Sequence, residues 1–451
     1  MADTFDLIVI GAGSAARNAA EKASREHSAR VALIESTRWG GSCPNVACRP
    51  TKAYLVAAEL AYTVNELSDW MGVRCGPAKV DLARVREWKD SLRRSQESWA
   101  EVLADAGYEL VLGEAAFVDE HTLRVDKREL TAERILIAAG SRTAVPDHAG
   151  IEEIDWLDHI SALELERIPE SLLVVGAGPV GLEFSQIFAR FGSRVTIINR
   201  DSRIASRSDG EAAAELQAAL EDEGIDVILD VGDVSFARKG DLTVVTLGDR
   251  ILGVTDVLLA SGRVPNTEAL ALERAGVDTN RGYVVVDGRQ RTSAAGIWAA
   301  GDVAVGPQFT PAASYQARLA VEDMFGVGSR LADYSFMPTA IFTDPELGAV
   351  GLTEQEARDA GHDIDVVKHP LPYVTRAQYT RTKHGVFKIV FDAKTRKVLG
   401  VHVVSRGASD IVGGLTPALK LGVTVDDLAE MHHVYPSFSE GVKAAAEQAL
   451  A

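Results

Sequence analysis

Apolar residues near the start of the chain follow two different patterns. Residues 5–35 read FDLIVIGAGSAARNAAEKASREHSARVALIE. The short uninterrupted apolar runs at each end are typical of buried strands, and the Ala-rich stretch between them is typical of a helix. The segment therefore predicts a strand, a glycine turn, a helix and a second strand that ends in an acid, which is one βαβ unit.

A second segment, residues 171–200, repeats this arrangement as SLLVVGAGPVGLEFSQIFARFGSRVTIINR. A glycine-rich turn between the first strand and the helix of a βαβ unit is typical of dinucleotide-binding domains. Two such units predict two dinucleotide sites in two Rossmann-like domains, which is an α/β fold.

The remaining segments are assigned by the same criteria. Residues 53–105 have a helical pattern, and residues 108–138 alternate apolar and polar positions as short strands do. The segment GIWAAGDVA predicts a strand that places Asp302 in a loop. Residues 385–405 predict a hairpin followed by helices, so we expect an α+β domain from about residue 336 onward.

The first glycine turn, GAGSAA, has the residues that a dinucleotide needs. Gly11 permits a tight turn, Gly13 lets the backbone approach a pyrophosphate, and a helix beginning near Ser14 offers its N-terminus to that anion. Ala15 belongs to the same expected site. Glu35 ends the second strand, where an acid accepts the ribose hydroxyls.

The second glycine turn differs from the first at the end of its second strand. Its turn residues are Gly176, Gly178, Val180 and Gly181. Asn199 stands where an acid would hold a free ribose 2′-hydroxyl, and Arg200 and Arg203 follow it. Two guanidinium groups can bind a 2′-phosphate, which predicts NADPH as the preferred cofactor and NADH as the less suitable one. The alternative is that both arginines are solvated surface residues.

Composition excludes several classes of partner. The chain has 451 residues and a formal net charge of -18, which would repel nucleic acid and anionic membrane surfaces. No apolar run approaches the roughly 20 residues that a membrane span needs. The start MADTFD lacks the basic residues of a secretory signal, so we expect a cytoplasmic protein with no nucleic-acid or membrane partner.

The chain has 3 cysteines, and two of them lie in GGSCPNVACRPTK, residues 40–52. Gly40 and Gly41 allow an irregular helix start at which Cys43 and Cys48 could come close enough to bridge. A thiolate at a helix N-terminus is stabilised and becomes nucleophilic. A zinc site would need a second Cys or His pair at ligand spacing nearby, and we find none, so we expect no metal site. From spacing alone the pair is either redox-active or structural, and Cys75 is expected to be an ordinary packed residue.

The cysteine segment closely resembles the GGTCxNxGCxPSK active site of class I pyridine nucleotide-disulfide oxidoreductases. This family includes glutathione reductase, dihydrolipoamide dehydrogenase and mercuric reductase. The resemblance extends over essentially the whole chain, through IAAGS at 137–141, ASGRVPN at 260–266, AAGDV at 299–303 and FTDPELGAVGLTE at 342–354. It implies FAD as a cofactor, a redox-active cysteine pair and an obligate homodimer.

The resemblance also implies a domain order. We expect the first part of an FAD-binding domain over 1–145, an NAD(P)-binding domain over 146–265, the second part of the FAD-binding domain over 266–335 and a dimerisation domain over 336–451.

Residue roles follow from the same resemblance. Cys48 resembles the charge-transfer thiol that lies against the flavin, and Cys43 resembles the interchange thiol that faces the substrate. Lys52 is expected near flavin N5, paired with Glu183, and Asp302 is expected to bind the ribityl or pyrophosphate part of FAD. The other positions expected at the bound cofactors are Gly41, Ser42, Ala139, Gly140, Gly262, Arg263 and Gly301.

The chain departs from thiol-disulfide reductases in the segment VYPSFSEG, residues 434–441. These enzymes usually have HPTxxE there, and the His serves as an acid-base partner from the other subunit. Tyr435 occupies the His position and Glu440 the Glu position, while His432 and His433 lie out of register. A tyrosine, with an ordinary pKa of about 10, mainly donates a proton, whereas a histidine near 6.5 both donates and accepts. The alternative is that Tyr435 only packs at the dimer interface.

Mercuric reductases and soluble transhydrogenases of the family also resemble this chain in having a Tyr at that position. Mercuric reductases end in a cysteine pair that AEQALA lacks, and transhydrogenases usually lack the second active-site cysteine, which this chain keeps. We therefore expect electrons to pass from NADPH through FAD and the cysteine pair to a small-molecule or metal-ion acceptor, such as a metal ion or a low-pKa disulfide. The alternatives are a dihydrolipoamide dehydrogenase-like enzyme and a redox-sensing flavoprotein.

Overall fold

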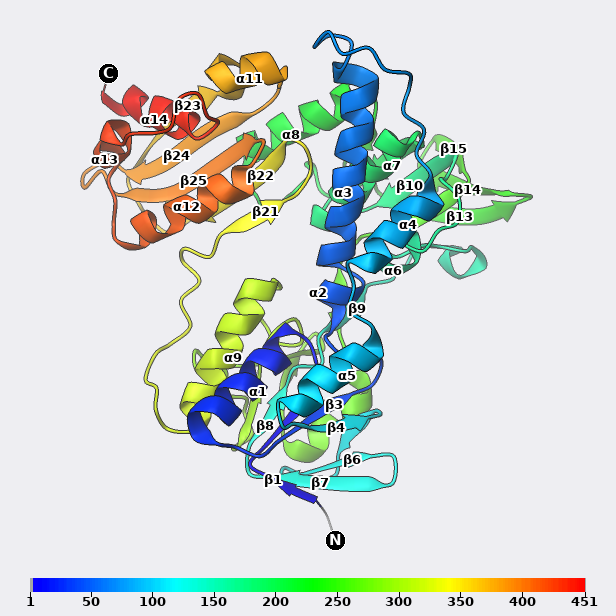
Figure 1. Cartoon of the computed structure of the whole chain (residues 1–451), viewed down its shortest axis with the longest axis vertical. Helices are drawn as coiled ribbons and strands as arrows, with labels where there is room; N and C mark the ends of the chain where they lie inside the picture. Colours follow the sequence, from blue (N-terminus) through cyan, green and yellow to red (C-terminus); the bar gives the residue numbers. More distant parts are fainter. Residues whose placement is uncertain (1–2, 451) are drawn as a thin grey trace. The chain divides into compact units, whose positions relative to one another are not determined.

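The computed structural model describes residues 3–450, and Figure 1 shows its elements along the chain. The chain forms two compact units. The first comprises residues up to Pro50, Lys89–Ala144 and Arg263–Asp333, and the second comprises Thr51–Trp88, Val145–Gly262 and residues from Tyr334 onward. Residues 1–2 and 451, which the predicted terminal domains include, lie outside the described residues. The finer division into three domains, with its boundaries, stays a prediction.

The centre of the first unit is a five-stranded parallel sheet with strand order β20-β8-β2-β3-β4. Its strands are β2 (Leu7–Ile10), β3 (Val31–Glu35), β4 (Glu109–Leu112), β8 (Ile135–Ile137) and β20 (Ile297–Ala299). Two helices, α1 (Ser14–His27) and α9 (Thr310–Met324), lie side by side against this sheet (Figure 1). The first predicted βαβ unit is therefore confirmed, with Glu35 as the last residue of its second strand.

The small side chains of α1 explain this close helix packing. Its buried residues are all alanines, and together with buried residues of α9, β2 and β3 they form one core cluster. A second cluster includes residues from the other face of the sheet and from the four-stranded sheet β1-β7-β6-β5. That sheet consists of β1 (Asp3–Phe5), β5 (Ala115–Phe117), β6 (Thr122–Val125) and β7 (Arg128–Ala132).

The remaining elements of the first unit are short. They are α2 (Ser42–Asn45), α5 (Gln96–Asp105), β9 (Ser141–Thr143), β17 (Arg263–Pro265), η3 (Glu268–Leu270), η4 (Leu272–Ala275), β18 (Thr279–Asn280) and β19 (Tyr283–Val284). β9 and β17 pair in antiparallel fashion, as do β18 and β19.

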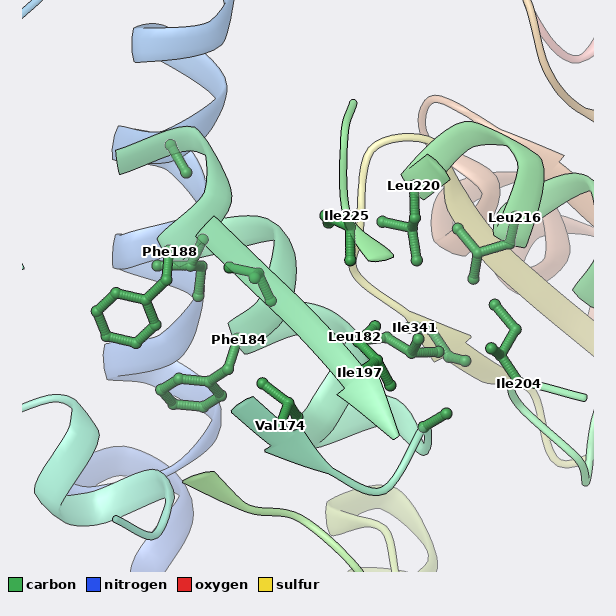
Figure 2. Packing of buried hydrophobic residues seen from close by; sticks show 14 of the residues in the cluster. Val174, Leu182, Phe184, Phe188, Ile197, Ile204, Leu216, Leu220, Ile225 and Ile341 are labelled. Atoms are coloured by element: carbon green, nitrogen blue, oxygen red, sulfur yellow. The ribbon is translucent and has the colours of Figure 1, made fainter. Parts of the chain in front are cut away.

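The second unit contains the second predicted βαβ unit, which is also confirmed. A four-stranded parallel sheet has the order β12-β11-β10-β16. Its strands are β10 (Ser171–Val175), β11 (Arg194–Ile198), β12 (Asp226–Ile228) and β16 (Asp256–Leu259), and its helices are α7 (Pro179–Phe191) and α8 (Gly210–Asp222). Val174, Phe184 and Phe188 belong to the core of this region, which Figure 2 shows together with Ile341 from the C-terminal part of the chain.

The C-terminal segment forms a five-stranded antiparallel sheet, which confirms the predicted hairpin and α+β character. Its order is β21-β22-β25-β24-β23. The strands are β21 (Thr339–Ile341), β22 (Glu346–Gly351), β23 (Ile364–Pro370), β24 (Val386–Asp392) and β25 (Val398–Ser405), and the helices are α10 (Glu354–Asp359), α11 (Thr375–Thr380), α12 (Ala408–Lys420), α13 (Val425–Glu430) and α14 (Glu440–Glu447). Two 3-10 turns, η5 (Leu371–Tyr373) and η6 (Gln448–Leu450), complete it.

The predicted helical stretch 53–105 is only partly correct. Two helices, α3 (Cys48–Tyr62) and α4 (Leu82–Ser91), are separated by a π-helical segment, η1 (Thr63–Leu67), and by residues 73–81, which are neither helix nor strand. Gly76 and Pro77 interrupt the helical pattern there, because glycine and proline disfavour helix interiors. The other elements of the second unit are α6 (His159–Ala162), η2 (Ile151–Glu153), β13 (Val234–Lys239), β14 (Leu242–Leu247) and β15 (Arg250–Val254).

Candidate active site

The first glycine turn has a geometry that only glycine adopts easily. Gly11 has a φ of 111°, and a Cβ added to it would clash with the carbonyl oxygen of Ala138. Gly13 is the N-cap of α1, and it makes no side-chain cap. The first backbone N–H groups of a 14-residue helix are therefore not capped by a side chain, and the first turn contains no acidic residue. This arrangement fits an anionic pyrophosphate.

Glu35 is buried at the end of β3, where its carboxylate accepts hydrogen bonds from the glycine turn and from the residues that follow β3. Oε2 accepts the N–H of Ala12 at 2.9 Å, and Oε1 accepts the N–H of Thr37 at 2.9 Å and that of Arg38 at 3.2 Å. A carboxylate has about four acceptor sites, so Oε2 keeps the capacity for a ribose hydroxyl. The predicted role of Glu35 at the ribose stays a prediction.

Asp302 follows β20 and joins a network with two other expected site residues. Ser141 Oγ donates to Asp302 Oδ2 at 2.9 Å, and Arg263 donates through Nε to Ser141 Oγ at 2.7 Å. Arg263 Nε also lies 3.6 Å from Asp302 Oδ2. Gly301 has a φ of 81°, and its N–H donates to the buried Gln316 side chain at 2.7 Å. The loop is thus held in one conformation at the carboxyl end of the parallel sheet, where nucleotides bind in such folds.

Three further glycines expected at the cofactors also require the left-handed region of φ. Gly140 and Gly41 have φ of 69° and 73°, and Gly262 has 144°. Ala139 precedes Gly140, and its carbonyl oxygen accepts Asn266 Nδ2 at 2.9 Å. These positions explain why the expected turns contain glycine, and their contacts with a cofactor stay predictions.

The cysteine segment packs directly on the first glycine turn. A Cβ added to Gly41 would clash with the Cα of Gly13, so the two backbones touch. Ser42 and Cys43 open the short helix α2, and Cys48 opens α3 after a break at residues 46–47. The predicted irregularity is therefore present, as two helix starts in place of one. Cys43 is half-buried and Cys48 is exposed.

Two side chains to which the sequence analysis gave no role, Asn45 and Gln96, fix this segment. Asn45 Nδ2 donates to the carbonyl oxygens of Trp39 at 2.9 Å and Gly41 at 2.7 Å. Gln96 on α5 accepts the N–H of Trp39 at 2.7 Å and donates to Asn45 at 3.4 Å. Asn45 matches the N of the family segment GGTCxNxGCxPSK, but no local pattern indicated that Gln96 contacts it.

Lys52 and Glu183 form the ion pair that the resemblance implies. Lys52 Nζ donates to Glu183 Oε2 at 2.7 Å. Glu183 lies on α7 and is 5% exposed, and its Oε1 accepts the N–H of Phe342 at 3.1 Å. The ring of Phe342 lies 4.3 Å from Lys52 Nζ, a cation-π contact that sequence reasoning did not predict. The ammonium group is thus held on two sides, while its role beside the flavin stays a prediction.

The second glycine turn repeats the first in backbone geometry. Gly176 has a φ of 108°, and a Cβ there would meet the carbonyl oxygen of Ala260 at 2.5 Å. Gly178 is the uncapped N-cap of the 13-residue α7, and Pro179 follows it. Gly181 packs on the carbonyl oxygen of Gly176, and Val180 is exposed beside it. The turn fits a second pyrophosphate.

The predicted 2′-phosphate residues lie together in one loop after β11. Asn199 Oδ1 accepts the N–H of Ala177 at 3.3 Å, and its Nδ2 donates to the carbonyl oxygen of Arg203 at 3.0 Å. Arg203 Nη2 donates to the carbonyl oxygen of Ser206 at 2.6 Å, whereas the Arg200 side chain is 91% exposed. Asn199 therefore holds the loop to the glycine turn, and both guanidinium groups are in contact with solvent.

Tyr435 and Glu440 are also placed by the structure. Tyr435 is 70% exposed, and Glu440 Oε2 accepts the N–H of Ser437 at 2.9 Å. His433 Nδ1 lies 3.2 Å from Ser439 Oγ, and burial lowers the pKa of His433. Glu440 thus orders the segment that carries Tyr435, which offers its phenol to the outside of the subunit.

One expectation about the cysteines is wrong. Cys75 is exposed, with its Sγ 3.3 Å from Ser68 Oγ, so it does not pack in a core. It lies in the irregular stretch after η1, where the sequence pattern had predicted a continuous helix. Over residues 3–450 no cluster of His, Cys, Asp or Glu could hold a metal ion. In that same range no helix is long and apolar enough to cross a membrane.

Comparisons with known proteins agree with this geometry. The family model of pyridine nucleotide-disulphide oxidoreductases matches residues 5–317, and that of the family's dimerisation domain matches residues 337–446. A mercuric reductase from Staphylococcus aureus is 36% identical over 449 residues, which are 98% of this chain and 82% of the relative. A dihydrolipoyl dehydrogenase from Thermus scotoductus is 38% identical over 455 residues, which are 98% of this chain and 97% of the relative.

A solved structure extends the comparison to the three-dimensional fold. The Cu(II) complex of the HOCl-induced flavoprotein disulfide reductase RclA from Escherichia coli has a TM-score of 0.88 and 31% identity, with 99% of each chain covered. The expected fold, with FAD- and NAD(P)-binding regions and a dimerisation domain, is therefore confirmed. The chain belongs to the class I pyridine nucleotide-disulfide oxidoreductase family and is a flavoprotein disulfide oxidoreductase.

Proposed function

We propose that the chain is an NADPH-dependent flavoenzyme in which Cys43 and Cys48 form a redox-active disulfide that passes electrons to a small acceptor. The main support is the packing of the cysteine segment on the first glycine turn, where Gly41 touches Gly13. Cys48 also begins the 15-residue helix α3, where a thiolate is stabilised. FAD, when bound, supplies the two-electron relay between the nicotinamide and this disulfide.

The chain's own residues would hold the charges of this site. Glu183 is buried, and its carboxylate accepts a hydrogen bond from the Lys52 ammonium. The position of that cation is therefore set by Glu183. We assign Lys52 the role of the cation beside the flavin and Glu183 the role of its anchor. Arg200 and Arg203 are open to solvent, which supports their proposed role in binding the 2′-phosphate of NADPH.

We further propose that two copies of the chain form the enzyme and share their active sites. The match to a dimerisation domain supports this arrangement. Val434 and Tyr435 are 78% and 70% exposed in one subunit, so they are accessible to a partner. In this proposal Tyr435 lies beside the cysteines of the other subunit and donates a proton or orients the acceptor.

The acceptor is proposed to be a metal ion, or a disulfide whose thiols have a low pKa. A thiolate that is a good leaving group needs little protonation, and a metal ion needs none, so neither requires a histidine base. Two comparisons support a metal ion as the acceptor: relatives are named mercuric reductase, and RclA was solved as a Cu(II) complex. Each NADPH supplies two electrons, which would reduce one Hg(II) to Hg(0) or two Cu(II) to two Cu(I).

An acceptor screen tests this proposal. NADPH oxidation is followed with Cu(II), Hg(II), oxidised glutathione, lipoamide and quinones as acceptors. We expect the fastest turnover with a metal ion, and we expect it to be lost in Cys43→Ser and Cys48→Ser and retained in Cys75→Ser, a matched control at an exposed cysteine. Metal-ion turnover that persists in Cys43→Ser would contradict the proposed path of the electrons.

A dihydrolipoamide dehydrogenase-like activity is the second candidate, because His433 offers a base. Burial lowers the pKa of His433, which keeps its imidazole neutral and able to accept a proton at pH 7. A dihydrolipoyl dehydrogenase is also among the relatives of similar identity. This candidate predicts rapid oxidation of dihydrolipoamide that is abolished by His433→Ala and unchanged by His432→Ala. The absence of that activity would leave the metal-ion proposal as the better supported one.

A further inference from the structure

Arg17 is a half-buried cation on α1, within the first turns after the glycine turn. Its guanidinium carbon lies 4.9 Å from the centroid of the Trp99 ring, and that of Arg94 lies 5.2 Å from the same centroid. The Nε of Arg17 is shielded from solvent and has no hydrogen-bond partner among residues 3–450. The cation is therefore held by its contact with the aromatic ring, and its Nε makes no hydrogen bond to a carboxylate within residues 3–450.

Trp99 connects Arg17 with the cysteine segment. A Cβ added to Gly40 would clash with the indole of Trp99, so the ring packs directly against the residue that precedes Gly41. The same helix, α5, fixes the segment through Gln96. One face of α5 thus holds both the cysteine segment and the guanidinium group.

The charges around Arg17 favour a negative charge on Cys43. Burial lowers the pKa of Arg17, and a thiolate at Cys43 and the carboxylate of Glu21 act in the opposite direction. Glu21 already accepts from Arg25 at 2.6 Å, so its charge is shared with another arginine. Arg94, whose guanidinium carbon also lies over the Trp99 ring, adds a further positive charge. Charge interactions are reciprocal. Because a thiolate at Cys43 favours the charged form of Arg17, Arg17 favours the thiolate form of Cys43.

We propose that Arg17, held by Trp99, is a positioning residue that keeps Cys43 in its thiolate form when the cysteine pair is reduced. The inference rests on the proposed function and deepens it. Tyr435 stands where related reductases place a histidine base, and a cation in the same chain as Cys43 supplies part of what that base would supply. It also accounts for a half-buried arginine whose shielded Nε makes no hydrogen bond among residues 3–450.

The thiolate fraction of Cys43 can be measured directly by alkylation. In the FAD-loaded Cys48→Ser/Cys75→Ser protein, Cys43 is the remaining one of the 3 cysteines. Its thiolate displaces iodide from iodoacetamide, which forms one S–C bond and breaks one C–I bond. The rate is recorded from pH 5 to 9 by mass spectrometry, in this background alone and with Arg17→Met, Arg17→Lys or Arg124→Met added.

We expect Arg17→Met to move the midpoint of the pH profile upward by about one unit, which lowers the rate about tenfold below the midpoint. Arg17→Lys keeps a cation and should restore most of the difference. Arg124→Met, at an exposed position of β6 in the same unit, should leave the profile unchanged. An identical profile for Arg17→Met and the parent, or an equal shift for Arg17→Lys and Arg17→Met, would overturn the proposal.

Two measurements keep the result interpretable. The FAD content and melting temperature of each variant show whether it folds, and Arg17→Gln replaces Arg17→Met under the same criteria if the latter does not. Alkylation requires no acceptor, so a failed acceptor screen with a shifted profile would count against the proposed function alone. A working screen with an unshifted profile would count against the role of Arg17 alone.

Discussion

Lys388 tests how ion pairs join the C-terminal sheet to helix α8. It lies on β24 and is 1% exposed, and its Nζ lies 2.7 Å from Glu354, 2.9 Å from Glu211 and 3.0 Å from Asp209. Asp209 is the N-cap of α8, where it also accepts the N–H groups of Glu211 and Ala212. Lys388→Met keeps the length of the side chain and removes the charge.

The structure indicates how large the effect should be. The Glu211 and Glu354 side chains are 47% and 31% exposed, so water can take over their solvation when the cation is lost. Asp209 is 3% exposed and would keep a buried charge, which the N-terminus of α8 offsets in part. Leaving one buried charge unpaired costs about 3 to 5 kcal/mol, and the helix N-terminus places the expected loss near the lower end, about 3 kcal/mol.

The dependence on pH has a definite sign. Burial opposes the charge on Lys388, but its bonds to Glu354, Glu211 and Asp209 outweigh burial and raise the pKa of Lys388 to about 12, from 10.5. A raised pKa stabilises the fold fully below the unfolded value of 10.5, and this stabilisation is lost as the pH rises through 12. The shift corresponds to about 2 kcal/mol, since each unit is about 1.4 kcal/mol. Lys388→Met should lack this alkaline component.

Urea titrations of the FAD-loaded protein at pH 7 measure the change as a shift of the midpoint at constant slope. Lys368→Met is the matched control, because Lys368 pairs with Glu211 at 2.6 Å at the surface, where such a pair contributes about 0 to 1 kcal/mol. The double variant Lys388→Met/Asp209→Asn should be more stable than Lys388→Met by about 1 kcal/mol or more, because asparagine removes the unpaired buried charge. The reasoning is refuted if Lys388→Met destabilises no more than Lys368→Met.

The remaining predictions concern the chemistry. NADPH should give a kcat/KM at least tenfold above that of NADH, because about 1.4 kcal/mol of phosphate contact at Arg200 and Arg203 suffices, and equal efficiencies would exclude this role. Cys43→Ser should leave Cys48 as a thiolate that gives a long-wavelength absorbance band with oxidised flavin, while Cys48→Ser should give none; a band in both variants would reverse or remove the assignment. Tyr435→His should raise turnover of oxidised glutathione or dihydrolipoamide, since general acid-base catalysis contributes about 10² to 10⁴-fold. An unchanged rate with normal flavin reduction by NADPH would favour a packing role for Tyr435.

Local sequence patterns predicted the two βαβ units because each strand, turn and helix in them is specified by neighbouring residues. The run LIVI and the alanines of residues 15–23 specify a buried strand and a small-residue helix face without reference to distant segments. The tight turns were predictable because glycine, here Gly11 and Gly176, readily adopts the positive φ values that other residues rarely adopt. The irregular start at Cys43 and Cys48 followed from the adjacent glycines for the same reason.

Contacts between distant segments could not be predicted in this way. Gln96 and Trp99 reach the cysteine segment because of where α5 packs, and their spacing along the chain resembles that of any amphipathic helix. Lys388 sits in a strand pattern at a buried position, which local rules would assign to an apolar residue; its three carboxylates come from α8 and α10. The Lys52 and Glu183 pair was expected from the family resemblance, and nothing in the local pattern indicated it.

The duplicated glycine turn has a consequence for how cofactor choice can change. Gly11 and Gly176 have nearly equal φ values, 111° and 108°, and each begins the same backbone cradle before an uncapped helix. A cradle made of main chain recognises any pyrophosphate, so it carries no information about which nucleotide arrives. In the proposed function, discrimination between nucleotides falls to side chains at or just after the end of the next strand, which are Glu35 in one unit and Asn199, Arg200 and Arg203 in the other. A change of nucleotide preference would therefore require substitutions at these few positions, while the backbone turns that bind the phosphates could stay the same.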